Sequence, residues 1–285
     1  LIESKKYEAI TVLQLLLRIN GYMADITGKI DNETLAQIRR FKVLMNLDDP
    51  MNDDPSHLRI RNRIDQKLIC ALIRSCGYLD RDTICCDTSF IITQEYANDL
   101  KNHDYSIVGR YISGMVGERS KALTIDEIEV LKRNKIDLFL IFQEGARGID
   151  YFTTKDRAKN DGDLINQKMK ELKIPNNNVI FVAVDFDIFE YDFIKYIVPY
   201  FEQLNKIVTD YRIGVYASRQ GCKILKERNL AFGFFVAGAS TGFSGNYQPI
   251  PPCWHFEQFR VDIKAGNLPI DKDAISLNYK ECIVD

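Results

Sequence analysis

The chain has 285 residues, of which 46% are hydrophobic and 27% charged, and its formal net charge is −2. This composition is ordinary for a globular protein, and it excludes a disordered chain, a collagen-like fibre and a low-complexity scaffold. No basic block is present, so nucleic acid is not an expected partner. The apolar runs are far shorter than the roughly 18 residues of a membrane span, and no signal peptide is visible.

Cysteine and histidine spacing gives no indication of a metal or cofactor site. The seven cysteines form no CxxC pair and are odd in number, so buried free thiols are expected rather than a disulfide framework. His57, His103 and His255 lack the spacing of zinc ligands. We therefore expect no metal and no cofactor.

Residues 1–80 predict a small unit made only of helices. The first helix is expected to end at Asn20-Gly21, because glycine suits the end of a helix. Asp31 is placed to cap a second helix. An exposed loop is expected at 48–63, and a third helix should run from Asp65 to about Gly77.

Residues 82–285 predict a second domain, because strands and helices alternate from there on. Strands are expected at 83–87, 107–112, 137–142, 178–185, 211–216, 232–237 and 253–259. Helices are expected at 93–102, 124–134, 155–172, 191–209 and 218–228. This alternation favours an α/β fold, a TIM-like (β/α) barrel preceded by the three-helix unit. Few helices are predicted in the last third, so the final strands should close the barrel through loops.

Acidic residues stand at the ends of several predicted strands and in a presumed last strand at 270–273, and the active site of a (β/α) barrel lies at the strand ends. They are Asp87, Glu144, Asp185, Asp187, Asp271 and Asp273. Asp185 and Asp187 are two residues apart, so on a strand both carboxylates would point into the barrel. Nearby like charges raise the pKa of one carboxyl, which can then donate a proton while the other acts as base or nucleophile. The pattern favours glycoside hydrolysis; acids that only cap helices or pair with basic residues are the alternative.

A series of segments then identifies a family resemblance. The segments are Cys86–Thr88, Val108–Ile112, Lys121–Thr124, Phe142–Glu144, Ile180–Asp187, Tyr211–Tyr216, Ala237–Ala239, Trp254–Gln258 and Asp271–Asp273. In this order they resemble the Rv2525c-like (DUF1906) family of glycoside hydrolase-like domains, which is akin to the family 25 lysozymes. The resemblance implies a barrel with a muramidase-like acidic pocket.

The expected site combines two catalytic carboxylates with a set of glycan contacts. Asp185 and Asp187 are the expected catalytic pair. Family 25 lysozymes have a glutamate as general acid at the second position, and Asp187 is one methylene shorter, so Glu144 is the alternative acid. The expected substrate contacts are Asp87, Arg110, Tyr216, Trp254, Gln258, Asp271 and Asp273. Asp87 and Asp271 would orient the sugar or the attacking water, and Trp254 would stack on a sugar, with a place in the core as its alternative.

The first unit resembles the three-helix peptidoglycan-binding domain. The resemblance lies within residues 8–75 and rests on Leu13–Leu17, Asn20–Tyr22, Gly28–Ile30, Thr34–Ile38 and Phe41. It implies that this unit tethers the barrel to the cell wall. A three-helix linker domain with no ligand is the alternative.

The sequence therefore predicts a cell-wall-directed, muramidase-like glycoside hydrolase whose partner is peptidoglycan or a related glycan. It is expected outside the cell or at the cell wall. One alternative is a non-catalytic module that binds glycan in the same groove. Another is a phage- or toxin-associated lysin that reaches the wall through partner proteins and so needs no signal peptide of its own.

Overall fold

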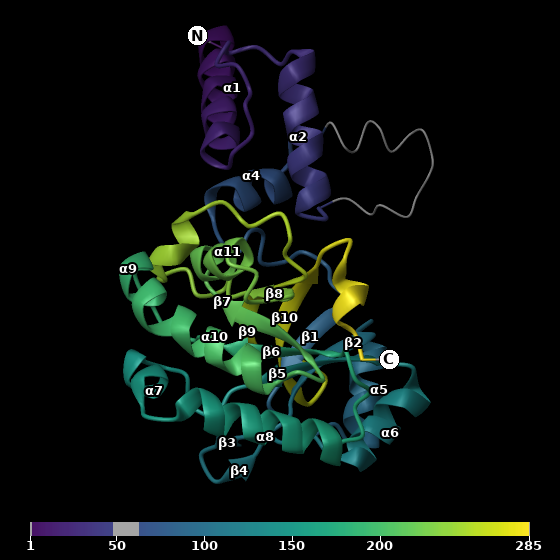
Figure 1. Cartoon of the computed structure of the whole chain (residues 1–285). Coiled ribbons are helices and arrows are strands. Elements are labelled where there is room, and N and C mark those ends of the chain that lie inside the picture. Colours follow the sequence, from purple (N-terminus) through teal and green to yellow (C-terminus); the bar gives the residue numbers. More distant parts are fainter. Residues whose placement is uncertain (1, 48–62, 285) are drawn as a thin grey trace.

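The structure, a computed structural model, describes residues 2–47 and 63–284. The predicted loop at 48–63, with His57, therefore lies outside the described residues except for Arg63. Figure 1 shows a group of N-terminal helices next to a barrel wrapped by further helices. No helix among the described residues is long and apolar enough to cross a membrane.

The N-terminal unit consists of α1 (Ile2–Ile19), α2 (Asn32–Leu44) and α4 (Gln66–Ile73). The predicted cap of α2 is present, because Asp31 Oδ1 accepts the backbone N–H of Thr34 at 2.7 Å. The buried Gln14 joins this turn to α1, since its Oε1 accepts the N–H of Gly28 at 2.9 Å and its Nε2 donates to Thr34 Oγ1 at 2.9 Å. The third helix ends at Ile73, one turn earlier than predicted.

The rest of the chain builds a closed eight-stranded barrel in the order β1-β10-β9-β8-β7-β6-β5-β2. Its strands are β1 (Cys85–Thr88), β2 (Ile107–Tyr111), β5 (Asp137–Phe142), β6 (Val179–Ala183), β7 (Arg212–Ala217), β8 (Gly233–Val236), β9 (Phe256–Ala265) and β10 (Leu268–Ile275). A short hairpin, β3 (Met115–Val116) and β4 (Arg119–Ser120), projects beyond β2. The α/β class and the TIM-like barrel predicted from the sequence are confirmed.

Helices cover the barrel from outside, on most of its circumference (Figure 1). They are α5 (Gln94–Asn102), α6 (Ile125–Asn134), α7 (Ile149–Thr153), α8 (Arg157–Glu171), α9 (Glu190–Asp192), the π-helical turn η1 (Phe193–Ile197), α10 (Val198–Ile207) and α11 (Arg219–Glu227). Two short 3-10 turns follow, η2 (Ser244–Tyr247) and η3 (Tyr279–Cys282). No helix of the α5–α11 set lies between β8 and β9, where η2 and a loop make the connection.

The final strands are joined through loops, as predicted, but their directions were not predicted. β9 and β10 form an antiparallel hairpin, and β10 is also antiparallel to β1, whereas the other neighbouring strands are parallel. A parallel crossover needs a dozen or more residues, usually with a helix, while an antiparallel pair needs only a tight turn. The short turn before Leu268 therefore reverses the last strand. Asn267 N–H donates to Asp99 Oδ2 at 3.0 Å, which fixes the hairpin against α5.

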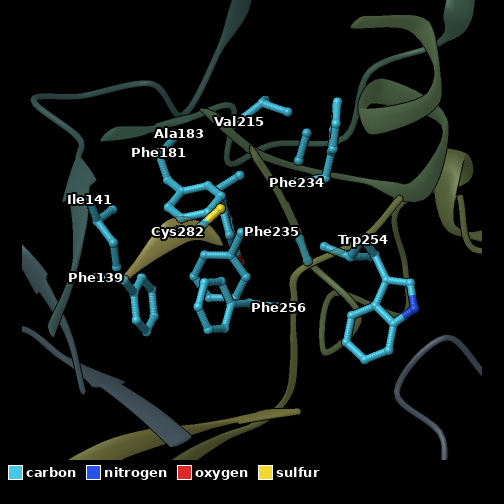
Figure 2. Packing of buried hydrophobic residues seen from close by; sticks show 14 of the residues in the cluster. Phe139, Ile141, Phe181, Ala183, Val215, Phe234, Phe235, Trp254, Phe256 and Cys282 are labelled. Carbon is cyan, nitrogen blue, oxygen red and sulfur yellow. The ribbon is translucent and has the colours of Figure 1, made fainter. Parts of the chain in front are cut away.

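Phenylalanine rings fill the interior of the barrel. Phe139 stacks on Phe256 with ring centroids 4.2 Å apart, and Phe181 and Phe235 pack against both edge-on. Figure 2 shows these rings grouped together. Gly109 makes room for them, because a Cβ there would lie 2.3 Å from the Phe139 ring. Because the aromatic plug fills the interior, a ligand site of this barrel is expected at one of its ends.

The N-terminal unit packs on the side of the barrel, at the β8–β9 connection. Trp254 Nε1 donates to the carbonyl of Leu44 at 2.9 Å, and Ser75 Oγ donates to the carbonyl of Gly238 at 2.8 Å. The structure places buried side chains of both parts in one continuous core. The division at about residue 81 into independently folding domains stays a prediction.

Candidate functional site

A cavity of about 250 Å³ opens at the carboxyl ends of the parallel strands, above the phenylalanine plug. Each strand around the opening contributes a side chain to it. The polar residues that line it are Asp87, Tyr111, Gln143, Arg147, Asp185, Tyr216, Ser240, Gln258 and Asp271. Ile141, Ala183, Phe235 and Val261 complete its walls.

Strand alternation explains which residues face the cavity. Side chains two apart point to the same face, so β5 directs Phe139 into the plug and then Ile141 and Gln143 towards the opening. On β6, Phe181 and Ala183 face inward in the same way, and Asp185, two residues further along, also lines the cavity. The cavity is thus built from the last inward-facing residue of each strand.

Asp87 and Asp271 lie side by side at the base of the opening, as paired residues of β1 and β10. Gln258 Nε2 donates to Asp87 Oδ2 at 2.7 Å and lies 3.4 Å from Asp271 Oδ2. Tyr216 orients this amide, because its hydroxyl donates to Gln258 Oε1 at 3.0 Å. The Tyr111 hydroxyl lies 3.4 Å from Asp87 Oδ1. A single amide thus bridges two carboxyl groups.

The two carboxyl groups of this pair favour their protonated forms. Burial, and then the negative charge of Asp271, raises the pKa of Asp87 well above its usual range. Burial also raises the pKa of Asp271 to about 6. No lysine or arginine in the described part of the chain forms an ion pair with either group. The pair can therefore hold a proton near neutral pH.

Asp185 lies on the opposite wall in a different environment. Its side chain is 28% exposed, and its Oδ2 accepts from Gln143 Nε2 at 3.0 Å and lies 4.0 Å from Arg147 Nε. A cation and an amide donor both stabilise a negative carboxylate. The cavity therefore combines a pair of carboxyl groups with raised pKa values and, opposite them, a carboxyl group beside a cation, and glycoside hydrolysis uses two acids in different roles.

A second pocket, of about 460 Å³, adjoins the first and shares Asp87, Tyr111, Gln143, Arg147 and Asp271 with it. Glu144 and Lys121 line this pocket, and the β3–β4 hairpin provides its apolar wall. No group of three or more His, Cys, Asp or Glu side chains that could hold a metal ion is found in residues 2–47 and 63–284.

The family model for the Rv2525c-like, glycoside hydrolase-like domain matches residues 98–275. This is more than half of the chain and includes most of the barrel. The chain belongs to this family.

Two curated proteins are similar to this chain over most of its length. The uncharacterized protein FadG of Bacillus subtilis is 32% identical over 282 residues, which are 95% of this chain and 47% of that protein. The uncharacterized protein YbfG of the same organism is 35% identical over 229 residues, which are 74% of this chain and 31% of that protein. The chain thus spans half or less of the length of these relatives.

Solved structures show the same fold. The Mycobacterium tuberculosis Tat-secreted protein Rv2525c, solved in complex with L-tartrate, has a TM-score of 0.57 at 19% identity and covers 68% of this chain and 95% of its own. An uncharacterized protein of B. stearothermophilus has a TM-score of 0.52 at 19% identity and covers 70% of this chain and 98% of its own. The Rv2525c-like barrel is therefore the fold of this chain.

The expectation that Asp185 and Asp187 point into one pocket is wrong. β6 ends at Ala183, before both residues, so strand periodicity no longer fixes their directions, and only Asp185 lines the cavity. The exposed Asp187 carboxylate instead accepts the N–H and the hydroxyl of Ser244, each at 2.7 Å. Asp187 lines neither of the two pockets. A sequence motif counted along a strand fails where the strand has ended.

Arg110 is not placed to bind a substrate. It is fully buried on the outer face of β2, and its guanidinium lies 2.5 Å from Glu127 Oε1, with a further bond to the Thr88 carbonyl. Thr124 is the N-cap residue of α6, and Glu127 lies three residues after it. Its N–H bonds Thr124 Oγ1, but its carboxylate turns to Arg110 and the N–H of Ile92. This ion pair is structural.

Trp254 and Asp273 are also absent from the cavity wall. Trp254 is 1% exposed and lies at the start of β9, against the N-terminal unit; Figure 2 shows its ring nitrogen turned away from the barrel core. The place in the core is therefore confirmed over the stacking role. Asp273 is fully buried behind Asp87, where burial and the charges of Asp87 and Asp271 raise its pKa well above its usual range. Neither side chain can contact a glycan in the cavity.

Several polar residues at the opening were not among the predicted site residues, namely Tyr111, Lys121, Gln143, Arg147 and Ser240. Gln143 could have been found, because it has the same strand parity as Phe139 whereas Glu144 has the opposite parity. Lys121 and Arg147 lie on loops after β4 and β5, for which periodicity carries no information. Asp87, Tyr216, Gln258 and Asp271 do lie at the cavity as expected.

Proposed function

We propose that this Rv2525c-like barrel hydrolyses glycosidic bonds in peptidoglycan. The observation that carries the proposal is the asymmetry of the carboxyl groups around one cavity. Asp87 and Asp271 are drawn together by the amide of Gln258 and have raised pKa values, while Asp185 faces them beside Arg147. Environments that separate the pKa values of neighbouring acids are typical of acid–base catalysis.

In the proposed reaction the Asp87–Asp271 pair donates a proton to the glycosidic oxygen as the bond to the anomeric carbon breaks. Gln258 holds the two carboxyl groups together, so the proton can stay within the pair until transfer. The negative Asp185 stabilises the positive charge that develops on the sugar, and acts on the anomeric carbon directly or through a water molecule. Glu144, exposed in the adjoining pocket, remains the alternative proton donor.

The cell wall is the proposed location of this activity. The family resemblance to muramidases and the Tat secretion of Rv2525c support a substrate outside the cytoplasm. In the N-terminal unit, Gly28 has the positive φ of +65° expected for its turn, and Thr34 and Phe41 are buried as in a three-helix peptidoglycan-binding domain. We propose that this unit holds the barrel at its polymer, which raises the local substrate concentration.

Digestion of purified peptidoglycan by the full chain, followed by mass analysis of the released fragments, tests the proposal. New reducing ends at muramic acid are expected. Asp185→Asn should lower the rate by about 10²–10⁴, the usual contribution of a general acid or base. Asp163→Asn, at an exposed ion pair of α8, is the matched control and should keep the parental rate.

The alternative of a non-catalytic glycan-binding module draws support from one observation, the position of Asp187 outside the cavity. This alternative predicts that the chain is retained by insoluble peptidoglycan and releases no fragment. Fragments released equally by the parent and by Asp185→Asn would place the chemistry elsewhere. Absence of both retention and release would contradict the proposed function altogether.

A further inference from the structure

The pocket next to the acid cavity differs from it in being lined by a lysine, Lys121. Its wall towards the cavity is shared, but its far side is formed by Ser89, by Lys121 and by Met115 and Val116 of the β3–β4 hairpin. Met115 and Val116 are exposed apolar side chains, which suit the C–H face of a sugar. A glycan whose scissile bond lies over Asp185 would therefore continue into this second pocket.

Lys121 lines the second pocket although it is only 5% exposed. Its ammonium donates to Gln143 Oε1 at 3.1 Å and lies 4.0 Å from the centre of the Tyr111 ring. An ammonium group has three N–H donors, and the described residues provide no carboxylate within ion-pairing distance of this one. Burial lowers the pKa of Lys121 to about 8. An anion arriving in the pocket would stabilise this buried charge.

Arg147 is the second cation and stands at the boundary of the two pockets. Its side chain is 79% exposed, and its ion pair with Asp185 is long at 4.0 Å. The loop that carries it is fixed, because Asp185 N–H donates to the carbonyl of Ala146 at 3.0 Å. Three acidic residues also line this pocket, Asp87, Asp271 and the exposed Glu144, and none of them forms an ion pair with Lys121 in the described part of the chain. The guanidinium can thus turn to a ligand without breaking a strong contact.

We propose that this second pocket is a subsite for a sugar that carries a free carboxylate, with Lys121 and Arg147 as the groups that bind it. The inference rests on the proposed glycoside hydrolysis and names the substrate class for it. Both cations are available to a ligand, since Lys121 forms no ion pair among the described residues and the contact of Arg147 with Asp185 is long at 4.0 Å. A guanidinium and an ammonium together also match the two oxygens of a carboxylate.

A subsite for a free carboxylate requires that another reaction at the wall comes first. In peptidoglycan the lactyl carboxylate of muramic acid is joined to the stem peptide by an amide bond. A free carboxylate arises only when that amide has been hydrolysed. The reaction class that supplies the substrate of this site is therefore amide hydrolysis, and the preferred polymer is the peptide-free glycan strand.

Binding of matched oligosaccharides to the full chain tests the subsite. The probes are the peptide-free tetrasaccharide of alternating N-acetylglucosamine and N-acetylmuramic acid, the same tetrasaccharide with its carboxylates converted to methylamides, and the uncharged tetramer of N-acetylglucosamine. Titration calorimetry with the Asp185→Asn chain avoids turnover. The acid form should bind at least about tenfold more tightly than the methylamide, as expected for one charge-assisted contact.

Two variants assign the preference to the pocket. Lys121→Met keeps the length of the side chain and should weaken binding of the acid form by about 10- to 100-fold while leaving the methylamide unchanged. Arg147→Gln, at an exposed position where folding is not at risk, should weaken it in the same selective way. Lys206→Met, on the exposed face of α10, is the control.

Each outcome decides between the proposals. Equal binding of the acid and the methylamide, or an equal loss for both in the two variants, would overturn the carboxylate subsite and leave glycan hydrolysis standing. Binding of none of the three probes would overturn both. Selective loss in Lys121→Met and Arg147→Gln, with Lys206→Met unchanged, is the supporting result.

Discussion

Two regions of the molecule contain buried acidic side chains, with cation partners in one region and without them in the other. Where the N-terminal unit meets the barrel, Glu257 is fully buried and receives Arg81 Nη2 at 2.7 Å and Arg219 Nη2 at 3.3 Å. At the barrel opening, Asp87 and Asp271 are buried against each other and have no cation within ion-pairing distance among the described residues. The Glu257 carboxylate is therefore paired with cations, whereas the two acidic groups at the opening have only each other.

The ion pairs of Glu257 stabilise the contact between the two parts of the chain, whereas the Asp87–Asp271 pair suits the proposed proton transfer. The Glu257 carboxylate is matched by two guanidinium partners, and Arg81 also lies over the Phe259 ring at 4.0 Å. A pair of buried acids without a partner costs folding free energy unless one of them keeps its proton. Proteins tolerate such a cost at sites that need a poised proton. Substitutions in the two regions should therefore change stability in opposite directions.

The largest effect is expected from Asp87→Asn, which keeps the shape of the side chain and removes its proton. Hydrolysis of peptidoglycan should fall by about 10²–10⁴, because the donor pair is broken. Thermal unfolding should stay unchanged or move to higher temperature. Release of fragments at the parental rate would show that Asp87 takes no part in proton transfer.

At the contact between the two parts of the chain, Glu257→Gln should destabilise the protein by about 3–5 kcal/mol, because it leaves two buried guanidinium groups without their carboxylate. Urea unfolding monitored by circular dichroism measures this. The control is Glu227→Gln at the exposed Lys223 pair of α11, where a change below about 0.5 kcal/mol is expected. Similar small changes for both variants would contradict the structural role of the Glu257 cluster.

Asp271→Asn should have the opposite sign. With a pKa of about 6 in the folded chain and 3.8 as the reference value, the folded state binds the proton more tightly. The stability linked to this group is therefore fully present below pH 3.8 and is lost as pH rises through about 6. The variant should be more stable than the parent above pH 6 by up to about 3 kcal/mol, and the two should converge near pH 4. A parent more stable than the variant at pH 7 would refute the raised pKa.

Asp187→Asn should have the smallest effect of the carboxylate variants. Its carboxylate accepts two bonds from Ser244 at the surface and does not reach the cavity. We expect hydrolysis to remain within about tenfold of the parental rate, well above that of a variant lacking its acid or base. A loss as large as that of Asp185→Asn would restore Asp187 to the catalytic pair predicted from the sequence.

Much of the fold could be predicted from the sequence because its signals are local. Helix caps such as Asp31 act over three residues, and the strand-like runs placed β1, β2, β5, β6, β7 and β8 to within a few residues. The antiparallel closure by β10 could not be predicted, since it depends on which strand edge is left unpaired when the barrel forms. The same distinction applies to Glu127, whose N–H follows the local motif while its carboxylate follows Arg110.

For the site, the sequence by itself determined which strands end in acids, because the strands can be located from their apolar runs and the acids stand directly at the ends of these runs. Only the tertiary structure decided which acids meet. Asp87 and Asp271 are far apart in the chain and are brought together by strand pairing. Asp185 and Asp187 are close in the chain, but both lie after the end of β6, and their side chains have different surroundings. Electrostatic environment depends on distance in space and on burial, and neither quantity is encoded by sequence spacing once a strand has ended.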